Sequence, residues 1–428
     1  MTSDLHKLSA LDAGAKIAAG ELSSERLVRA CLDFIRTRED AVGAWQHLDE
    51  EYALAEARAA DAASPRSALH GVPFAVKDVI DTADLPTEHG SVLFAGNRPA
   101  TDAACVAAMR RAGAVLLGKT VTTEFATYTP GKTRNPHNAA HTPGGSSSGS
   151  AAAVGGDMVP LAFGTQTAGS LIRPAAYCGA AAFKPTHGTV DVAGIFELVP
   201  RLDTLGYMAR AVDDLAAFYG IVRGEDDRPP LAEGLGRPPR IGLCRTHHWG
   251  EAGPETVEAV ESAAALCAVQ GATVGECLLP PSFADLAQTH TTVLFAGLAR
   301  SMKDIYREDG DRLSERLRGM IEEGMETSEV RLVEAQAHAE RSIMQFATAT
   351  APWDVLLTPA TPGEAPAGEA TGNPIFQIVW TLLQVPCVTI PWSTGPNGLP
   401  VGVQIVGRKG DDERVLRVAK WLEARRDR

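Results

Sequence analysis

The sequence predicts an α/β fold in which a large mixed central β-sheet is covered by helices on both faces. Short apolar runs of strand length alternate with segments of helical period, and this alternation is typical of such sheets. The runs are VPFAVKDVI (72–80), AVLLGKT (114–120), VPLAFGT (159–165), IGLCRT (241–246), ATVGECLLP (272–280), DVLLTP (354–359), CVTIP (387–391) and GLPVGVQIVG (398–407). Turn residues such as Gly and Pro bound most of them.

Helices are expected between and around these runs. Residues 8–64 indicate helices with short breaks, and further helices are predicted at 103–112, 150–155, 255–269, 374–384 and 411–424. The segment 283–349 is strongly helical and charged on one side, so we expect a helical excursion from the sheet. With no repeat and no long linker, we expect a single domain over 1–428: N-terminal helices (1–65), a core (66–225) and a second α/β part with the helical lobe (226–428).

The composition limits the classes of function. The 428 residues carry a net charge of −13 and no basic run beyond a tail of Arg425, Arg426 and Arg428, which argues against nucleic-acid binding. No apolar stretch is long enough to span a membrane, and the N-terminus does not resemble a signal peptide. The seven scattered cysteines have no CxxC spacing and indicate core residues in a reducing compartment. We therefore expect a cytoplasmic protein.

The stretch 143–174 is the most informative part of the chain. It holds two hydroxyl-rich loops, GGSSSGS (144–150) and TQTAGS (165–170), separated by one predicted helix and one predicted strand. A small-residue loop can surround an oxyanion with consecutive backbone N–H groups while Ser170 presents an attacking oxygen. The alternative is that each loop is only a tight turn that needs glycine for its backbone angles.

Other candidates in this region are weaker. Residues 145–149 formally match G-x-S-x-G, which would make Ser147 a nucleophile, but the motif needs a strand before it and HNAAHTPG precedes it here. The histidines show no partnering pattern with a serine. His137 and His141 lie four apart in a proline-containing loop rather than on a helix, so no metal site is expected.

Lys77 lies inside the apolar run 72–80, where a lysine is uncommon unless it is paired or used in catalysis. Burial disfavours the ammonium form and lowers its pKa, so a neutral amine at this position can act as a base. The alternative is an ion pair with Asp78 or Asp81 at the end of the strand.

These residues give the chain a resemblance to the amidase signature family of amide hydrolases, almost from end to end. The similar stretches are GELSSERLVRA, HGVPFAVKDVID, AGAVLLGKT, TRNPHNAAHTPGGSSSGSAAAV, GTQTAGSLIRPAAYCG, FKPTHG, DTLGYMARAVDDLA, DVLLTPATP and GLPVGVQIVGR. The glycine- and serine-rich signature is long and seldom met by chance. The resemblance implies the amidase signature fold and a Ser–cis-Ser–Lys site without metal or cofactor.

The family's site residues fall on matching positions of this sequence. The resemblance places the catalytic lysine at Lys77, a relaying serine after a cis peptide bond at Ser146, and the nucleophile at Ser170, 24 residues further on. It implies an acyl-enzyme on Ser170, with an oxyanion hole built from the backbone amides of Thr167, Ala168, Gly169 and Ser170.

The chain also departs from the family pattern around the nucleophile. Gln166 replaces an acid, Ala168 replaces a glycine, and Arg173 lies one place later than usual; Thr381 and Gln384 stand where the family often has Asn and Gly. These changes fall where a substrate pocket is expected. The candidate pocket residues are Gln166, Ile172, Arg173, Ile375, Phe376 and Trp380.

The resemblance implies an amidase, a hydrolase of C–N bonds other than peptide bonds. Its expected partner is a small-molecule amide, anilide, lactam or carbamate (urethane), with no nucleic acid, no membrane and a homodimer as the candidate assembly. An alternative is the glutaminase-type subunit of a tRNA-dependent amidotransferase or another multi-subunit assembly. The third reading, a non-catalytic binding protein on the same fold, is disfavoured because Lys77, Ser146 and Ser170 are all present.

Overall fold

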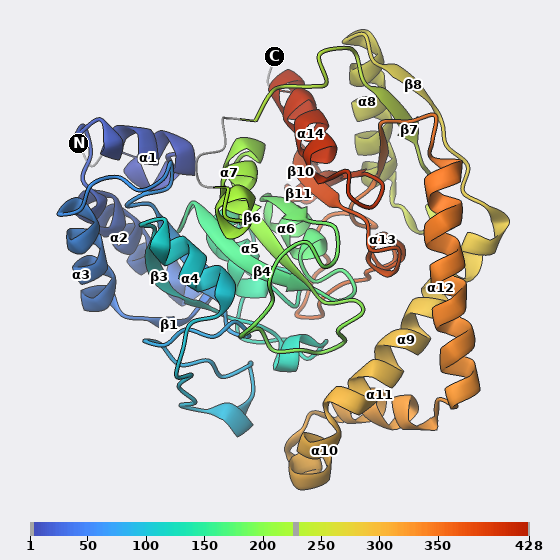
Figure 1. Ribbon diagram of the computed structural model, residues 1–428, viewed down its shortest axis with the longest axis horizontal. Coiled ribbons are helices and arrows are strands. Elements are labelled where there is room, and N and C mark those ends of the chain that lie inside the picture. Colours follow the sequence, from blue (N-terminus) through green and yellow to red (C-terminus); the bar gives the residue numbers. More distant parts are fainter. Residues whose placement is uncertain (1–3, 226–230, 427–428) are drawn as a thin grey trace.

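The centre of the computed structural model, which describes residues 4–225 and 231–426, is an eleven-stranded β-sheet (Figure 1). The strand order is β1-β3-β2-β4-β6-β5-β10-β11-β9-β7-β8. The strands are β1 (Trp45–Leu48), β2 (Pro73–Lys77), β3 (Val115–Thr120), β4 (Leu161–Gln166), β5 (Ala181–Lys184), β6 (Thr204–Ala209), β7 (Arg240–Leu243), β8 (Thr273–Glu276), β9 (Val355–Pro359), β10 (Cys387–Thr394) and β11 (Pro400–Val406).

The sheet is mixed, as the sequence predicts. Strand β2 pairs in parallel with β3 and β4, and β7 pairs in parallel with β8 and β9, whereas the strands between β4 and β9 pair antiparallel. Strands are found at all eight predicted runs, although β2 ends at Lys77 and residues 78–80 form a turn onto the Lys77 carbonyl. Lys77 is therefore the last residue of its strand.

One part of the N-terminal prediction is wrong. Strand β1, at 45–48, lies within the segment 8–64 that was expected to be helical with short breaks. It is a short edge strand that pairs antiparallel with β3 and buries Trp45. Such a strand is determined by its neighbour rather than by local sequence, so helical periodicity does not reveal it.

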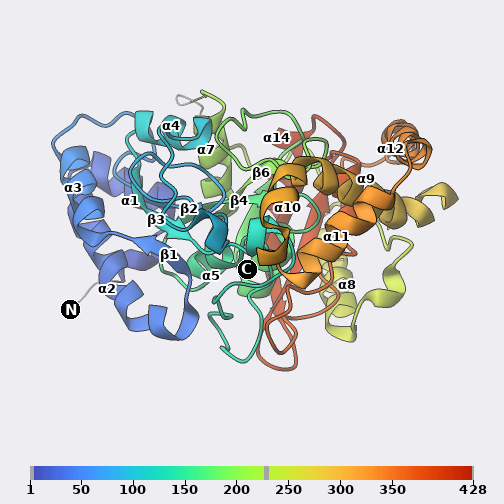
Figure 2. The ribbon, with the colours of Figure 1, turned by 90° about the horizontal axis from the view of Figure 1, so that it is seen from below.

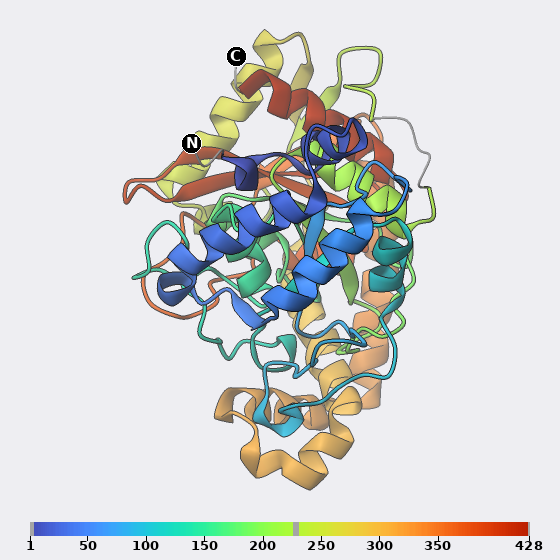
Figure 3. The ribbon, with the colours of Figure 1, turned by 90° about the vertical axis from the view of Figure 1, so that its left-hand side faces the viewer.

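Helices cover both faces of the sheet, as predicted. Helices α4, α7 and α14 gather on one face and α5 lies on the other (Figure 2), where α6 packs against α5. At one end of the sheet α2 and α3 lie side by side, and α3 contacts β3 (Figure 3). The helices outside the helical lobe are α1 (Ala10–Ala18), α2 (Ser24–Val42), α3 (Glu50–Asp61), α4 (Ala104–Arg111), α5 (Ser148–Gly155), α6 (Ile172–Cys178), α7 (Val212–Val222), α8 (Pro254–Val269), α13 (Ile378–Leu382) and α14 (Asp412–Arg426).

The predicted helical excursion at 283–349 is present and extends away from the sheet (Figures 1 and 3). It consists of α9 (Leu286–Ser301), α10 (Lys303–Asp309), α11 (Glu315–Glu326) and α12 (Glu329–Ala349). Helix α9 packs against α11 and α12, and it also contacts α13 at the sheet. His290 on α9 also contacts the carbonyl oxygen of Thr167, so the excursion reaches the second hydroxyl-rich loop.

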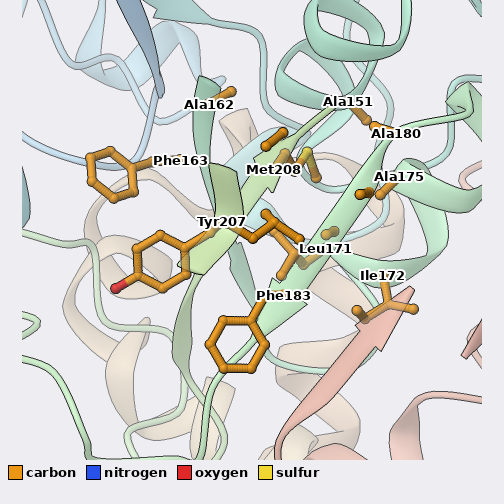
Figure 4. Packing of buried hydrophobic residues seen from close by; sticks show 14 of the residues in the cluster. Ala151, Ala162, Phe163, Leu171, Ile172, Ala175, Ala180, Phe183, Tyr207 and Met208 are labelled. Atoms are coloured by element: carbon orange, nitrogen blue, oxygen red, sulfur yellow. The ribbon is translucent and has the colours of Figure 1, made fainter. Parts of the chain in front are cut away.

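The core fixes the chain on the C-terminal side of Ser170. Leu171 is fully buried and belongs to the hydrophobic core (Figure 4). Its side chain lies over Gly164 of β4 and Gly206 of β6, which face each other in the strand register. A Cβ atom at either glycine would come within 2.7 Å of a Leu171 methyl group. The paired glycines thus leave room for Leu171 and hold the segment that carries Ser170 close to the sheet.

All seven cysteines are free and buried, as the sequence predicts. None of the described helices combines the length and the apolar character that crossing a bilayer requires. Position 226, the expected start of the second α/β part, and Arg428 of the basic tail lie outside the described residues.

Candidate active site

Lys77 is fully buried at the end of β2 and contacts two hydroxyl groups. Its Nζ donates hydrogen bonds to Ser146 Oγ and to Thr165 Oγ1, each at 2.7 Å. The alternative of an ion pair with Asp78 does not hold, because Asp78 Oδ1 lies 3.1 Å from Nζ of Lys119. The positive charge of Lys119 also acts on Asp81, where it opposes the rise in pKa that burial causes. The amine of Lys77 is therefore directed at hydroxyls rather than at a neighbouring acid.

Burial sets the protonation state of Lys77. Removal of the ammonium from water lowers the pKa of Lys77 to about 7, and the negative charge of Asp203 opposes part of this shift. A substantial fraction of the amine is then neutral near neutral pH, with a lone pair available to accept a proton.

The loop that carries Ser146 is held from several sides. The peptide bond between Gly145 and Ser146 is cis, as the family resemblance implies. The carbonyl of Gly145 accepts a hydrogen bond of 2.7 Å from Nη2 of Arg173, and the carbonyl of Ser146 accepts one of 3.3 Å from the Thr123 amide. Arg173 is buried, so this candidate pocket residue positions the loop that carries Ser146.

Ser147 ties the two hydroxyl-rich loops together. Its amide donates to the carbonyl of Ser170 at 3.1 Å. Its hydroxyl donates to the carbonyl of Thr165 and accepts from the amide of the same residue, both at 3.2 Å. With its hydroxyl engaged by the backbone, Ser147 supports the site, and the G-x-S-x-G match has no strand-to-helix elbow in the structure.

Ser170 lies in the short connection between β4 and α6 and is 7% exposed. The loop before it is anchored through its carbonyls: Thr167 O accepts from His290 Nε2 at 2.9 Å, and Ala168 O accepts from Thr381 Oγ1 at 2.7 Å. In a trans peptide the C=O and the following N–H point in opposite directions. The N–H groups of Ala168 and Gly169 therefore point away from His290 and Thr381.

Close packing against neighbouring residues explains why position 169 is a glycine. A Cβ at this position would come 2.6 Å from Oε1 of Gln377 and 3.0 Å from Cβ of Pro374. Gln377 is fixed in turn, since its Nε2 donates to the carbonyl of Ala360. A side chain at 169 would push the loop out of this position.

Gln166 organises the turn that follows the loop. Its Oε1 accepts hydrogen bonds from the amides of Leu171 (3.1 Å) and Ile172 (3.0 Å), and its Nε2 donates to Thr381 Oγ1 at 3.0 Å. Gln166 stands where the family has an acid. Its neutral amide hydrogen-bonds the backbone at the start of α6 and the hydroxyl of Thr381.

Three residues of the site have no counterpart in the sequence predictions: Thr165 as a partner of Lys77, Asp203 and His290. Asp203 accepts from Thr167 Oγ1 at 2.6 Å and from the amides of Leu198 and Val199, both at 2.7 Å. His290, on α9, is fully buried, and burial lowers its pKa to about 4, so the neutral ring donates from Nε2 to Thr167. His290 is 123 residues away from Thr167, so only the tertiary fold joins them; the hydroxyl-rich sequence around Thr165 was the one available signal.

The predicted pocket residues are placed mainly in the interior. Ile172, Phe376 and Trp380 belong to the hydrophobic core, and Ile375 packs against it half-buried. A separate cavity of about 170 Å³ lies beside the ends of β4 and β6, bounded by Thr165, Thr167, Asp203 and the segment 187–200. None of the six predicted pocket residues lines it.

Among the described residues, one group brings three metal-ligating side chains together: His47, Asp78 and Glu88. The ammonium of Lys119 lies against Asp78, and Glu88 accepts hydrogen bonds from Gln46 Nε2 and the Gly96 amide. These protein groups already supply positive charge and donors to the two carboxylates, and they disfavour a cation there.

The family model for amidases matches residues 26–416. A glutamyl-tRNA(Gln) amidotransferase subunit from Chloroflexus aggregans is 33% identical, over 97% of this chain and 96% of that protein. The corresponding protein from Acidothermus cellulolyticus is 35% identical, over 99% of this chain and 95% of its own length.

Two solved structures extend the comparison to the fold. The native peptide amidase from Stenotrophomonas maltophilia has a TM-score of 0.84 at 29% identity and covers 98% of this chain and 97% of its own. A 6-aminohexanoate cyclic dimer hydrolase has a TM-score of 0.86 at 26% identity, with the same coverage. The family match over most of the chain, with relatives above 30% identity along nearly their whole length, shows that this chain belongs to the amidase family.

Proposed function

We propose that this chain hydrolyses the C–N bond of a small amide, anilide, lactam or carbamate through an acyl-enzyme on Ser170. The observation that carries the proposal is the 2.7 Å hydrogen bond between Ser146 Oγ and a buried Lys77 whose pKa is about 7. A neutral amine next to a hydroxyl is the arrangement that general-base activation of a serine needs.

In the first half-reaction Lys77 takes the proton of Ser146 as Ser146 takes that of Ser170. The Ser170 oxygen forms a bond to the substrate carbonyl carbon, and the backbone amides of residues 167–170 stabilise the negative charge on its oxygen. The C–N bond breaks as the proton returns through Ser146 to the leaving nitrogen. Water then attacks the ester by the same relay, which releases the acid and restores Ser170.

The names of the solved neighbours support this reading, because a peptide amidase and a cyclic-dimer hydrolase both suggest C–N hydrolysis on this fold. The curated relatives favour a second candidate, the glutamine-hydrolysing subunit of a tRNA-dependent amidotransferase. In that role the chain would act in a multi-subunit complex.

The two candidates differ in substrate and in need of a partner. The purified chain is expected to release product from one or more of benzamide, acetanilide, a lactam and a phenyl carbamate without any other protein present. Release of ammonia from glutamine only, and only after partner subunits are added, would support the second candidate instead. No turnover of either kind would contradict both.

The pH profile of kcat/KM follows from the state of Lys77. The base is active as the neutral amine, so activity should rise with pH through about 7 and fall up to tenfold for each pH unit below it. His290 does not titrate in this range, because burial lowers its pKa to about 4. Rates measured from about pH 5 to about pH 9 with a neutral amide test this, and a flat profile would exclude Lys77 as the base.

A further inference from the structure

The cavity of about 170 Å³ beside the nucleophile loop carries an inference that rests on the proposed function and narrows its substrate. Two of its walls are Thr165 and Thr167, at the end of β4. Thr165 Oγ1 lies 2.7 Å from Nζ of Lys77, and Thr167 belongs to the loop that anchors Ser170. A group in this cavity therefore lies against the threonine that contacts Lys77 and against the loop that precedes Ser170.

The remaining walls are mostly apolar. Val190, Ile195, Phe196, Leu198 and Leu205 line the cavity, and Phe196 packs against the ring of Phe125 at 5.5 Å. Leu198 and Leu205 are buried, whereas Val190, Ile195 and Phe196 are half-buried and form the side nearer solvent. Walls of this kind favour an apolar group over a hydrated one.

The size of the cavity limits what it can hold. An engineered apolar cavity of about 150 Å³ takes up benzene. A space of about 170 Å³ is therefore large enough for one aromatic ring, or for an aliphatic group of that bulk.

The charges around the cavity are acidic. Asp203 lies in its wall with its carboxylate held by Thr167 and by two backbone amides, and Glu197 is exposed at its rim. The lining residues include no lysine or arginine, and His187 is bonded through Nε2 to the carbonyl of Pro200. A substrate carboxylate, such as that of glutamine, finds no cation here and meets like charge.

We propose that this cavity binds a neutral, apolar group of the size of one aromatic ring on the substrate, and that it selects against substrates bearing a carboxylate. The expected order of kcat/KM in a series of primary amides is benzamide above acetamide by tenfold or more. Both 2-naphthamide and 4-carboxybenzamide are expected to fall at least tenfold below benzamide.

Three variants test the walls. Val190→Trp fills the cavity and should lower the benzamide-to-acetamide ratio at least tenfold, while Phe196→Ala enlarges it and should raise the naphthamide-to-benzamide ratio by a similar factor. Glu197→Arg, at the rim, should raise the ratio of 4-carboxybenzamide to benzamide. Val269→Trp, on the far helix α8 with Val269 81% exposed, is the control and should leave all ratios unchanged.

Failure of this inference is distinguishable from failure of the proposed function. Benzamide binding to the Ser170→Ala variant, followed by ligand-detected NMR, tests the cavity without catalysis. Binding that is lost on adding Val190→Trp, in a protein whose wild type turns over no amide, would overturn the proposed function and keep the inference. Turnover with equal kcat/KM for acetamide, benzamide and 4-carboxybenzamide, or ratios unaffected by the three variants, would overturn the inference alone.

Discussion

Replacing Ser170 with alanine is expected to lower kcat for amide hydrolysis by about 10⁶-fold, the loss seen when a serine nucleophile is removed from a complete relay. The hydroxyl is the only group that forms the acyl bond in the proposed reaction, so neither Ser146 nor water replaces it. Covalent labelling by a fluorophosphonate, read by intact mass, should disappear in the same variant. The loop itself should persist, because its anchors are the carbonyls of Thr167 and Ala168 and the packing of Leu171.

The matched comparison for this variant is Ser147→Ala. Ser147 is the nucleophile that the G-x-S-x-G match suggests, yet its hydroxyl is bonded to the backbone of Thr165. Its loss should slow turnover through misplacement of Thr165 and leave covalent labelling in place. Labelling retained by Ser170→Ala and lost by Ser147→Ala would transfer the role of nucleophile to Ser147.

Replacing Lys77 with methionine is expected to lower kcat by about 10²–10⁴-fold, the usual contribution of a general base. Methionine approximates the length and the apolar stem of the side chain, and no charge is left buried. The variant should also lose the rise of kcat/KM through a pH of about 7. A purely structural defect would lower the rates but leave the shape of the pH profile unchanged.

Lys184 provides a control for the burial of a lysine. Like Lys77 it is fully buried on a strand, and burial lowers the pKa of both, but Nζ of Lys184 donates to the carbonyl of Pro185 rather than to a serine. Lys184→Met should keep the pH profile of the wild type. Unchanged kcat in Lys77→Met, in protein with an unaltered circular dichroism spectrum, would rule out the relay.

The sequence was sufficient for the parts of the site whose signal is local. Lys77 stands out as a charge within an apolar strand, and the two serine loops lie close together along the chain, at 144–150 and 165–170. The family resemblance added the roles of Ser146 and Ser170, and the structure brings Ser146 against Lys77 at 2.7 Å. The roles in catalysis stay predictions until the variants above are measured.

The supporting residues could not be predicted because their contacts are not local. His290 reaches Thr167 from a separate helix, and Asp203 reaches the same residue from the position just before β6. The interior positions of Phe376 and Trp380 likewise follow from how α13 and the residues before it pack, which a short apolar segment does not specify. Edge strand β1 was missed for the same reason, since its partner β3 comes much later in the chain.

The hydrogen bonds that hold the carbonyls of Thr167 and Ala168 affect the activation free energy of the proposed reaction. His290 and Thr381 hold the carbonyls of Thr167 and Ala168 from behind, so the N–H dipoles in front are oriented before any substrate arrives. In water, solvent dipoles must reorganise as a negative charge develops on the carbonyl oxygen. In the proposed reaction that reorganisation energy is met during folding, because the amides expected to bind the oxyanion are already oriented.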